Sequence, residues 1–387
     1  MTKPIEKLSE DFVSRYERDL YHCSSCNYCV DAVWPERGMH AVCATMEHHS
    51  RAPGYSGRGY IEAARAILEG QPLDGEALAE RVFTCTGCGN CEAACPIGLR
   101  PAAVGLALRE ELLAADCLPP ALASARDAFI AHGNPYGVAR EQRYAWATGL
   151  ARGGDEADTS FFAGCAAALA SGEEAQASLA LLHAAGLQPR LAGEGCCGAP
   201  LAELGLRREG EALARAVAAQ LARGGDVLVA GCECGRQLAT VGVASRSVAH
   251  WLCAAHAAGR VRLGWKHDVT RPAAVQLVES CQLKGESRDG DEAAVAALLA
   301  SLDVALLNPD FPNRHANCCG AGGGMPAMAP AAAARMARAR LPQAGVAVSL
   351  DARCARHLRA CADEGIEVLG FATFIARYFT LEAGPTA

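Results

Sequence analysis

The spacing of apolar residues along the chain changes character near residue 150. Before that point, Ile, Ala and Leu recur every three to four residues, which is typical of helices. This spacing predicts helices over residues 60–69 and 97–115, after an amphipathic opening over residues 5–20. The helix over 97–115 directly follows Pro96, and proline suits a first helical turn. The first part of the chain is therefore predicted to be rich in helices.

In the second part, short apolar runs alternate with longer segments that are rich in Ala, Leu and Arg. The short runs predict strands at 160–164, 226–230, 273–278, 303–307 and 345–350. The longer segments predict helices at 173–185, 207–223, 291–301 and 330–341. Strands that alternate with helices are typical of α/β units with parallel strands.

The cysteines of the second part repeat at a spacing of about 120 residues. The first set is Cys165, the pair Cys196–Cys197 before Gly198, and Cys232 with Cys234; the second is Cys281, the pair Cys318–Cys319 before Gly320, and Cys354. A short, polar, glycine-bearing segment at 152–159 fits a domain boundary. We therefore expect a helical domain at 1–115, a helical connector at 116–157, and two related α/β domains at 158–265 and 266–387.

The composition favours a protein that handles metals or electrons. The net charge of −7, with no stripe of Lys and Arg between aromatic residues, argues against binding of nucleic acid. The chain shows neither the apolar core of a signal peptide nor an apolar run long enough to cross a membrane, so we expect a cytoplasmic protein that reaches the inner face of a membrane only through a partner. In a reducing compartment, 20 cysteines indicate metal binding or redox chemistry rather than disulfides.

The most specific chemical signal is the run C-T-G-C-G-N-C-E-A-A-C-P, with cysteines at 85, 88, 91 and 95. This is the cysteine spacing that holds a cubane 4Fe-4S cluster, and in two-cluster ferredoxins the fourth cysteine of a run binds the other cluster. A second triplet, Cys23, Cys26 and Cys29, lacks the expected fourth cysteine, and Cys43 is the next candidate. We therefore predict two 4Fe-4S clusters, one bound by Cys23, Cys26, Cys29 and Cys95, and the other by Cys85, Cys88, Cys91 and Cys43.

Zinc is the alternative occupant of these motifs, because C-x2-C pairs also build tetrahedral zinc sites. Two C-x2-C-x2-C triplets and a C-P ending favour clusters instead. Cys43 is the least specific of the eight, since a lone cysteine in a loop can be incidental. Cys117, Cys253 and Cys361 fall outside every motif and are interpreted as small buried side chains.

The two C-C-G elements are the second chemical signal. Adjacent cysteines strain a single tetrahedral site but can bind neighbouring irons of one cluster, and the glycine after them lets the backbone pass close to it. The glycines of C-C-G-A-G-G-G (318–324) predict a loop pressed against something large, and Met325 in place of a final glycine excludes a dinucleotide fingerprint. The predicted metal ligands of this part are Cys165, Cys196, Cys197, Cys232, Cys234, Cys281, Cys318, Cys319 and Cys354, which would hold one or two further iron-sulfur clusters, with zinc as the alternative in one site.

The order of these cysteines, with Ser56-Gly57-Arg58-Gly59 between the two triplets, resembles iron-sulfur subunits that have two ferredoxin-type motifs and two cysteine-rich CCG domains. That family includes the D-type subunit of heterodisulfide reductase, the C-type subunit of anaerobic glycerol-3-phosphate dehydrogenase and the glycolate oxidase iron-sulfur subunit. The resemblance covers nearly the whole chain. It implies an α-helical ferredoxin-like N-terminal domain that carries electrons, followed by a pseudo-repeat of two α/β CCG domains. In heterodisulfide reductases, a CCG domain binds a non-cubane centre that cleaves a disulfide.

The chain departs from this family pattern at the end of each CCG domain. Heterodisulfide-type CCG domains end in C-x2-C, which gives five cysteines per site. The first domain here ends in Cys232-Glu233-Cys234, and the second keeps only Cys354, with Asp351 or His357, depending on register, at the partner position. Four thiolates suit an electron-relay cluster better than a disulfide-cleaving one. The stretch at 349–358 is more similar to the glycolate oxidase and lactate-utilisation branch, whose partners are flavin-linked dehydrogenases.

Three functions remain open. The leading hypothesis is an electron-transfer subunit, in which a flavoprotein dehydrogenase oxidises a small substrate and the clusters pass electrons to a quinone, a membrane subunit or a soluble carrier. The alternative is a heterodisulfide reductase-like enzyme whose active centre is the first CCG site. The third is a scaffold whose CCG cysteines bind structural zinc or nothing. No P-loop, G-x-S-x-G or H-E-x-x-H motif occurs, and Glu203 shows no partner for acid/base work, so no catalytic residue is predicted.

Overall fold

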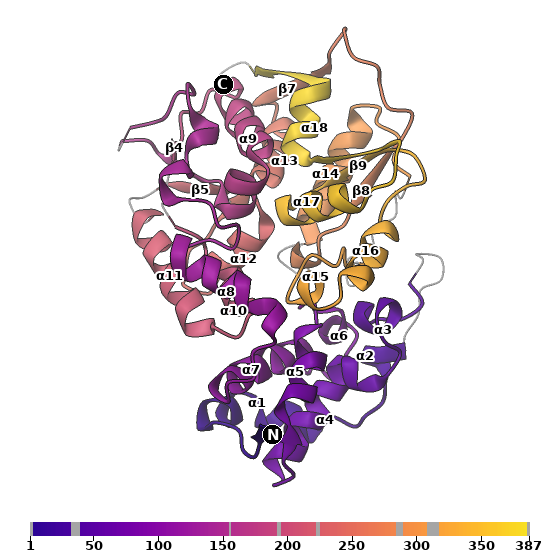
Figure 1. Cartoon of the computed structure of the whole chain (residues 1–387). Helices are drawn as coiled ribbons and strands as arrows, with labels where there is room; N and C mark the ends of the chain where they lie inside the picture. Colours follow the sequence, from indigo (N-terminus) through magenta and orange to yellow (C-terminus); the bar gives the residue numbers. More distant parts are fainter. Residues whose placement is uncertain are drawn as a thin grey trace. The chain divides into compact units, whose positions relative to one another are not determined.

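The computed structural model describes residues 3–31, 39–154, 156–191, 195–221, 225–283, 289–307 and 317–384. The chain divides into two compact units, and each is assembled from separate stretches of sequence. Unit one comprises the described parts of 1–127, 200–209 and 313–340, and unit two those of 128–199, 210–312 and 341–387 (Figure 1). The bounds of these units differ from the predicted domain ranges, because two later stretches join the N-terminal unit.

Unit one is built from helices, as predicted for the first part of the chain. Its helices are α1 (Glu10–His22), α2 (Tyr28–Asp31), α3 (Ala44–His48), α4 (Gly57–Leu68), α5 (Gly75–Phe83), α6 (Asn90–Ala93), α7 (Pro101–Ala114), α15 (Met325–Met328) and α16 (Pro330–Arg338). Two short strands, β1 (Pro4–Ile5) and β2 (Leu73–Asp74), pair antiparallel. Helices α8 (Pro120–His132) and α10 (Ala199–Glu203) lie at its boundaries in sequence.

Local sequence sets where these helices begin. The hydroxyl of Ser9 accepts a hydrogen bond from the Phe12 amide at the start of α1. Helix α7 starts at Pro101, later than predicted, because Gly98 adopts a left-handed φ of +68° that ends the turn after Cys95. Pro101 then occupies the first helical position, where its missing amide proton costs nothing.

The core of unit one lies between α1, α4, α5 and α7. Phe12, Tyr60, Phe83 and Leu108 are each 0% or 1% exposed within it. Helices α4 and α7 approach closely at Gly105, where an added Cβ would lie 2.6 Å from the Tyr60 ring. Leu204, from the stretch 200–209, also belongs to this core. That stretch is therefore part of the folded N-terminal unit.

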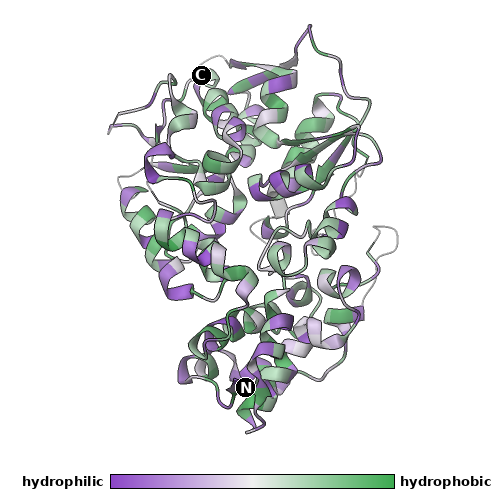
Figure 2. Ribbon diagram, in the orientation of Figure 1, coloured by the Kyte–Doolittle hydropathy of each residue, from purple (hydrophilic) through white to green (hydrophobic). Residues whose placement is uncertain are grey.

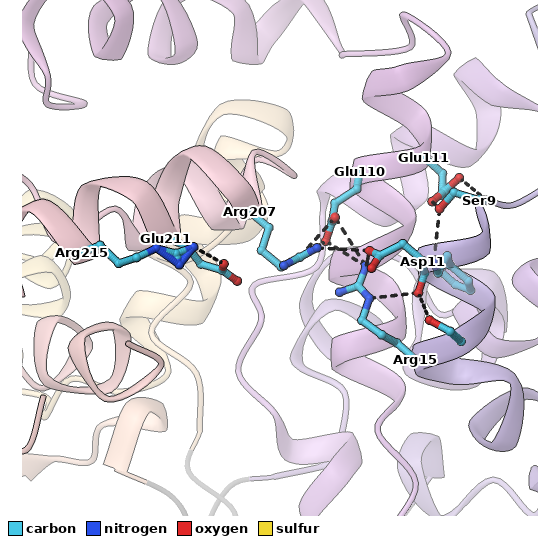
Figure 3. A network of polar contacts seen from close by, with 10 residues as sticks. Ser9, Asp11, Arg15, Glu110, Glu111, Arg207, Glu211 and Arg215 are labelled. Atoms are coloured by element: carbon cyan, nitrogen blue, oxygen red, sulfur yellow. Dashed lines mark hydrogen bonds and ion pairs between the residues drawn. The ribbon is translucent and has the colours of Figure 1, made fainter. Parts of the chain in front are cut away.

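A polar network fixes the same stretch on the surface of unit one (Figure 3). The Arg207 guanidinium lies 3.0 Å from Glu110 on α7 and 3.2 Å from Asp11 on α1. Arg15 contacts the same Asp11 at 2.9 Å. These side chains are between 21% and 43% exposed, so each pair contributes about 0–1 kcal/mol. The network orients the stretch, while apolar burial supplies most of its stability.

Unit two contains two parallel sheets with helices between their strands. The first has the strand order β4 (Arg190–Leu191), β3 (Thr159–Phe162), β5 (Asp226–Val229), β6 (Arg246–Ser247). The second has the order β8 (Val275–Val278), β9 (Gly345–Ser349), β10 (Ile366–Gly370), with a parallel bridge from Val275 to Leu306 on its outer side. The two sheets therefore share one connection order. A separate antiparallel pair joins β7 (Val261–Trp265) and β11 (Phe379–Ala383).

The helices of unit two alternate with its strands along the chain. They are α9 (Gly172–Ala184), α11 (Arg207–Leu221), α12 (Cys232–Ala239), α13 (Val248–Ala257), α14 (Asp289–Ser301), α17 (Ala352–Cys361) and α18 (Phe371–Tyr378). The prediction of strands alternating with helices is confirmed. The strand predicted at 303–307 is reduced to the single bridge at Leu306.

The core of unit two is continuous across both sheets and includes Phe161, Leu228, Leu277, Val348 and Phe374. Figure 2 shows the strands β8 and β9 as mostly hydrophobic, which suits strands covered on both faces. A buried carboxylate joins the two halves of this unit. Glu174 on α9 accepts hydrogen bonds from the amides of Ala372 at 2.9 Å and Thr373 at 3.0 Å, in the first turn of α18.

Candidate iron-sulfur sites

The first predicted quartet lines one cavity in unit one. Cys23 follows α1, Cys26 lies in the next turn, Cys29 is on α2, and Cys95 precedes Pro96; all four face the same cavity. Burial raises the pKa of Cys29 to about 11, and the neighbouring Cys23, Cys26 and Cys95 add to the rise. A thiol in such a site becomes a thiolate only when a cation compensates it. Four thiols around one cavity fit a cubane cluster, which takes one thiolate at each corner.

The turn after Cys95 is held by a buried carboxylate. Asp19 on α1 is 3% exposed and accepts hydrogen bonds from the Arg100 amide at 2.7 Å and from its guanidinium at 2.6 Å. The Leu99 amide donates to the Cys95 sulfur at 3.3 Å. Hydrogen bonds of this kind to a ligating sulfur orient it and tune the potential of the group it binds.

The second predicted quartet is also brought together within unit one. Burial raises the pKa of Cys43 to about 12, and the thiolates of Cys85 and Cys88 raise it further. Burial likewise raises the pKa of Cys91 well above its usual range, with Cys88, Cys85 and Cys43 among the contributing charges. Cys43 precedes α3 and Cys91 lies on α6. The four thiols thus lie near one another, and four thiolates are what a cubane cluster takes as ligands.

Close packing joins the two quartets to one another. Cys29 and Cys91 belong to one apolar cluster with Val30, Met46 and Ala102, and Cys43 packs against it. At Gly57, an added Cβ would lie 3.0 Å from the Cys91 sulfur, so only glycine fits there. The two quartets therefore share one apolar cluster within unit one.

A buried arginine that the sequence interpretation missed lies behind the second quartet. Arg109 on α7 is 0% exposed and donates hydrogen bonds to the carbonyl oxygen of Val82 at 2.8 Å, to that of Cys85 at 2.5 Å, and to that of Glu203. Burial lowers the pKa of Arg109, and the Cys85 thiolate opposes that shift. The helical spacing held a signal for this residue, because Arg109 falls seven residues after Ala102 and three before Leu112, which are buried on α7.

Glu203 therefore has partners that the sequence did not reveal. Glu203 is 6% exposed, and its carboxylate accepts a hydrogen bond from the Gly323 amide at 3.0 Å. Its carbonyl oxygen accepts from Arg109. The residue thus links α10 to α7 and to the glycine-rich loop.

The glycine-rich loop at 318–324 presses against the backbone beside the second quartet. An added Cβ on Gly323 would lie 2.1 Å from the carbonyl oxygen of Cys85, and one on Gly324 would lie 2.5 Å from that of Phe83. Cys318 is buried with Ala44 and Met325, and Cys88 packs against the same cluster. The predicted close approach of this loop is thus observed, and its contact is another part of the chain.

In unit two, four cysteines of the first CCG segment converge. The sulfurs of Cys165 and Cys196 are 3.4 Å apart. Hydrogen bonds from Cys196 and Cys234 lower the pKa of Cys197 well below its usual range, against the effect of burial. An added Cβ on Gly164, whose φ is +72°, would lie 2.6 Å from the Cys234 sulfur. Cys165, Cys196, Cys197 and Cys234 thus supply four buried thiols to one site.

Cys232 points to a different set of residues. Its sulfur lies 3.1 Å from the Ser280 hydroxyl and donates to Asp351 Oδ2 at 3.2 Å. The pKa of Cys232 is raised well above its usual range, mainly by burial and next by the charge of Asp351. The nearby Cys281 raises it further. The side-chain hydrogen-bond partners of Cys232 therefore come from the second CCG segment.

The remaining predicted ligands belong to different units. Cys281 and Cys354 are in unit two, whereas Cys318 and Cys319 are in unit one and are each 4% exposed. Cys117 and Cys253 are buried, as predicted, at 5% and 6% exposed, and Cys361 is partly buried. Across the described ranges, no three or more His, Cys, Asp or Glu side chains surround one point closely enough to hold a single ion. In the same ranges, no helix has the length and apolarity needed to cross a bilayer.

Comparisons with known proteins identify these cysteine patterns. Residues 18–99 match a 4Fe-4S dicluster domain, and residues 159–239 and 275–358 each match a cysteine-rich domain named CCG. The chain therefore belongs with the iron-sulfur proteins and contains a 4Fe-4S dicluster domain followed by two CCG domains.

The resemblance to the D-type subunit of heterodisulfide reductase is confirmed at low identity. Over 194 residues, the chain is 27% identical to the D-type subunit of the dihydromethanophenazine:CoB–CoM heterodisulfide reductase of Methanosarcina barkeri (strain Fusaro / DSM 804). The matched stretch covers 48% of this chain and 47% of that relative, so the chain spans about half of the relative's length. No solved structure matches the chain.

Proposed function

We propose that this chain is the electron-transfer subunit of a multi-subunit oxidoreductase. The observation that carries the proposal is the grouping of two four-cysteine sites within unit one, with Cys29 and Cys91 in one apolar cluster. An iron-sulfur cluster supplies reversible one-electron transfer when bound. The cysteines hold and space such clusters, and the buried apolar residues between them exclude water.

The order of sites supports a relay through the chain. The loop that carries Cys318 packs beside Cys88, a member of the second quartet, so the dicluster part and the second CCG segment meet within unit one. We propose two 4Fe-4S clusters in a ferredoxin-like helical unit and further iron-sulfur centres in the CCG domains, which form a pseudo-repeat. The donor is a flavin-linked dehydrogenase, and the acceptor is a quinone, a membrane subunit or a soluble carrier. The complex works in the cytoplasm, at the inner face of the membrane where a partner holds it.

Metal analysis of anaerobically purified full-length protein tests this proposal. Two cubane clusters give about eight irons per chain, and each further four-iron centre adds about four. We expect an iron content well above eight and a flavoprotein that co-purifies. About eight irons with one or two zincs would overturn the extended relay and leave only the dicluster part.

The similarity to a heterodisulfide reductase subunit favours one alternative, which is cleavage of a disulfide at a CCG-bound centre. Reduced protein would then cleave the S–S bond of a low-molecular-weight disulfide and release two thiols, with two electrons supplied through the clusters and two protons from solvent. We expect no turnover of such disulfides under anaerobic conditions if the protein is only a relay. Steady thiol release, dependent on a cysteine of a CCG site, would instead establish the alternative.

A further inference from the structure

We propose that Cys232, although it lies in the first CCG segment, is a ligand of the centre of the second CCG segment. The proposal rests on the proposed presence of iron-sulfur centres in these segments. It assigns to the first centre only Cys165, Cys196, Cys197 and Cys234.

The structure settles the register of the two segment ends. Helix α12 begins at Cys232 and α17 begins at Ala352, each directly after a cap residue, Gly231 or Asp351. With the helix starts superposed in sequence, Cys234 corresponds to Cys354, two residues into each helix. Cys232 then corresponds to Ala352 and has no counterpart in the second segment. Cys232 is therefore an additional cysteine rather than a displaced member of a C-x2-C pair.

The same register places Asp351 where the family pattern has a cysteine. Asp351 is three residues before Cys354 and is 3% exposed. Its Oδ1 accepts hydrogen bonds from the amides of Arg353 at 2.9 Å and Cys354 at 3.1 Å, which caps α17. One carboxylate oxygen is thus committed to the helix start. The other, Oδ2, faces Cys232.

The Cys232 sulfur contacts two residues that adjoin or bind predicted ligands of the second centre. One neighbour, Ser280, directly precedes Cys281, and its hydroxyl is 3.1 Å from the Cys232 sulfur. The other neighbour, Asp351, binds the Cys354 amide through its second oxygen. Cys232 is itself 6% exposed, so it faces the protein interior. A thiolate here would add a ligand next to Asp351, which is itself bound to the Cys354 amide.

An ion pair holds the two segment ends in this arrangement. Glu233, next to Cys232, lies 2.9 Å from the Arg353 guanidinium, and the two side chains are only 8% and 16% exposed. The ion pair thus joins the residue next to Cys232 on α12 to the residue next to Cys354 on α17. The pair fixes the helix starts relative to one another and so keeps the Cys232 sulfur beside Asp351.

Substitution of single cysteines tests the assignment. Full-length Cys232→Ser, Cys234→Ser and Cys281→Ser variants are purified without oxygen, and their iron content and EPR and Mössbauer spectra are compared. We expect Cys232→Ser to lose or alter the spectral component that Cys281→Ser affects, and to keep the one that Cys234→Ser affects. Cys253→Ser, at a buried cysteine outside the motifs, is the matched control and should keep every component.

Restoring the family residue provides a second test. In the double variant Cys232→Ala and Asp351→Cys, a cysteine returns to the position three residues before Cys354. We expect this variant to regain iron and the spectral component that Cys232→Ala alone lacks. The signals of the dicluster domain serve as an internal measure of folding in every variant.

Each outcome decides the assignment. A Cys232→Ser variant with the wild-type iron content and spectrum would overturn it, and so would a variant that matches Cys234→Ser. If the wild-type protein contains only dicluster iron, the proposed function fails first, and that result is distinct from a failure of Cys232 alone.

Discussion

The buried guanidinium of Arg109 yields a quantitative prediction for Arg109→Met. The substitution removes hydrogen bonds to three carbonyl oxygens in a site with no exposure to solvent. Leaving a buried carbonyl oxygen without its donor costs about 1–3 kcal/mol, so three such oxygens at a site that can partly relax cost about 3–5 kcal/mol in all. Because 1 kcal/mol shifts the melting temperature of a unit of this size by about 2–4 °C, we expect a decrease of about 6–20 °C.

The assay separates the loss of charge from a general loss of packing. Arg126→Met is the control, since that side chain is 39% exposed and forms an ion pair with the exposed Asp127; surface changes of this kind stay within about 0.5 kcal/mol. The 4Fe-4S cluster that we propose at Cys85 should also shift to a more negative reduction potential, because a nearby cation stabilises the reduced form of such a cluster. A melting temperature and potential equal to those of the control would refute the reasoning.

Three further predictions concern single side chains. Cys43→Ser should lower the iron content while Cys117→Ser leaves it unchanged, as measured by metal analysis after anaerobic purification; equal iron in both would remove Cys43 from the second quartet. Gly323→Ala should lower the melting temperature more than Gly186→Ala, because both residues have positive φ but only the alanine at position 323 would place its Cβ against a neighbouring carbonyl oxygen. Gly186→Ala, at an open position, should lose only about 1–2 kcal/mol of stability. An equal loss in both variants would contradict the close contact at Gly323. Burial raises the pKa of Glu174 above its usual 4.5, so the contribution of this residue to stability should fall as the pH rises above 4.5. The unfolding free energy of the wild type minus that of Glu174→Gln should therefore decrease as the pH rises from 4.5. A difference that does not change with pH would exclude the raised pKa.

The helical first part and the alternating second part could be predicted because both follow from local hydrophobic spacing. The grouping of Cys95 with the first triplet could also be expected, since the motif spacing carries that geometry. The environment of Cys232 could not, because it depends on a contact with Asp351, 119 residues away. The spacing along α7 places Arg109 on the buried face, but its hydrogen bond to Glu203 and its contact with the loop at 318–324 depend on distant parts of the sequence.

The division of unit one into separate stretches of sequence has a consequence for synthesis. Its N-terminal stretch ends at residue 127, but the last stretch ends at residue 340, 213 residues later (340 − 127). At about 5–20 residues per second, a ribosome takes about 10–40 s to supply that difference. During this interval the second quartet lacks the glycine-rich loop that presses on Cys85, and Arg109 lacks the acceptor at Glu203 for the first part of it. The cysteines of this quartet therefore stay uncovered by these later stretches until the stretches have been synthesised.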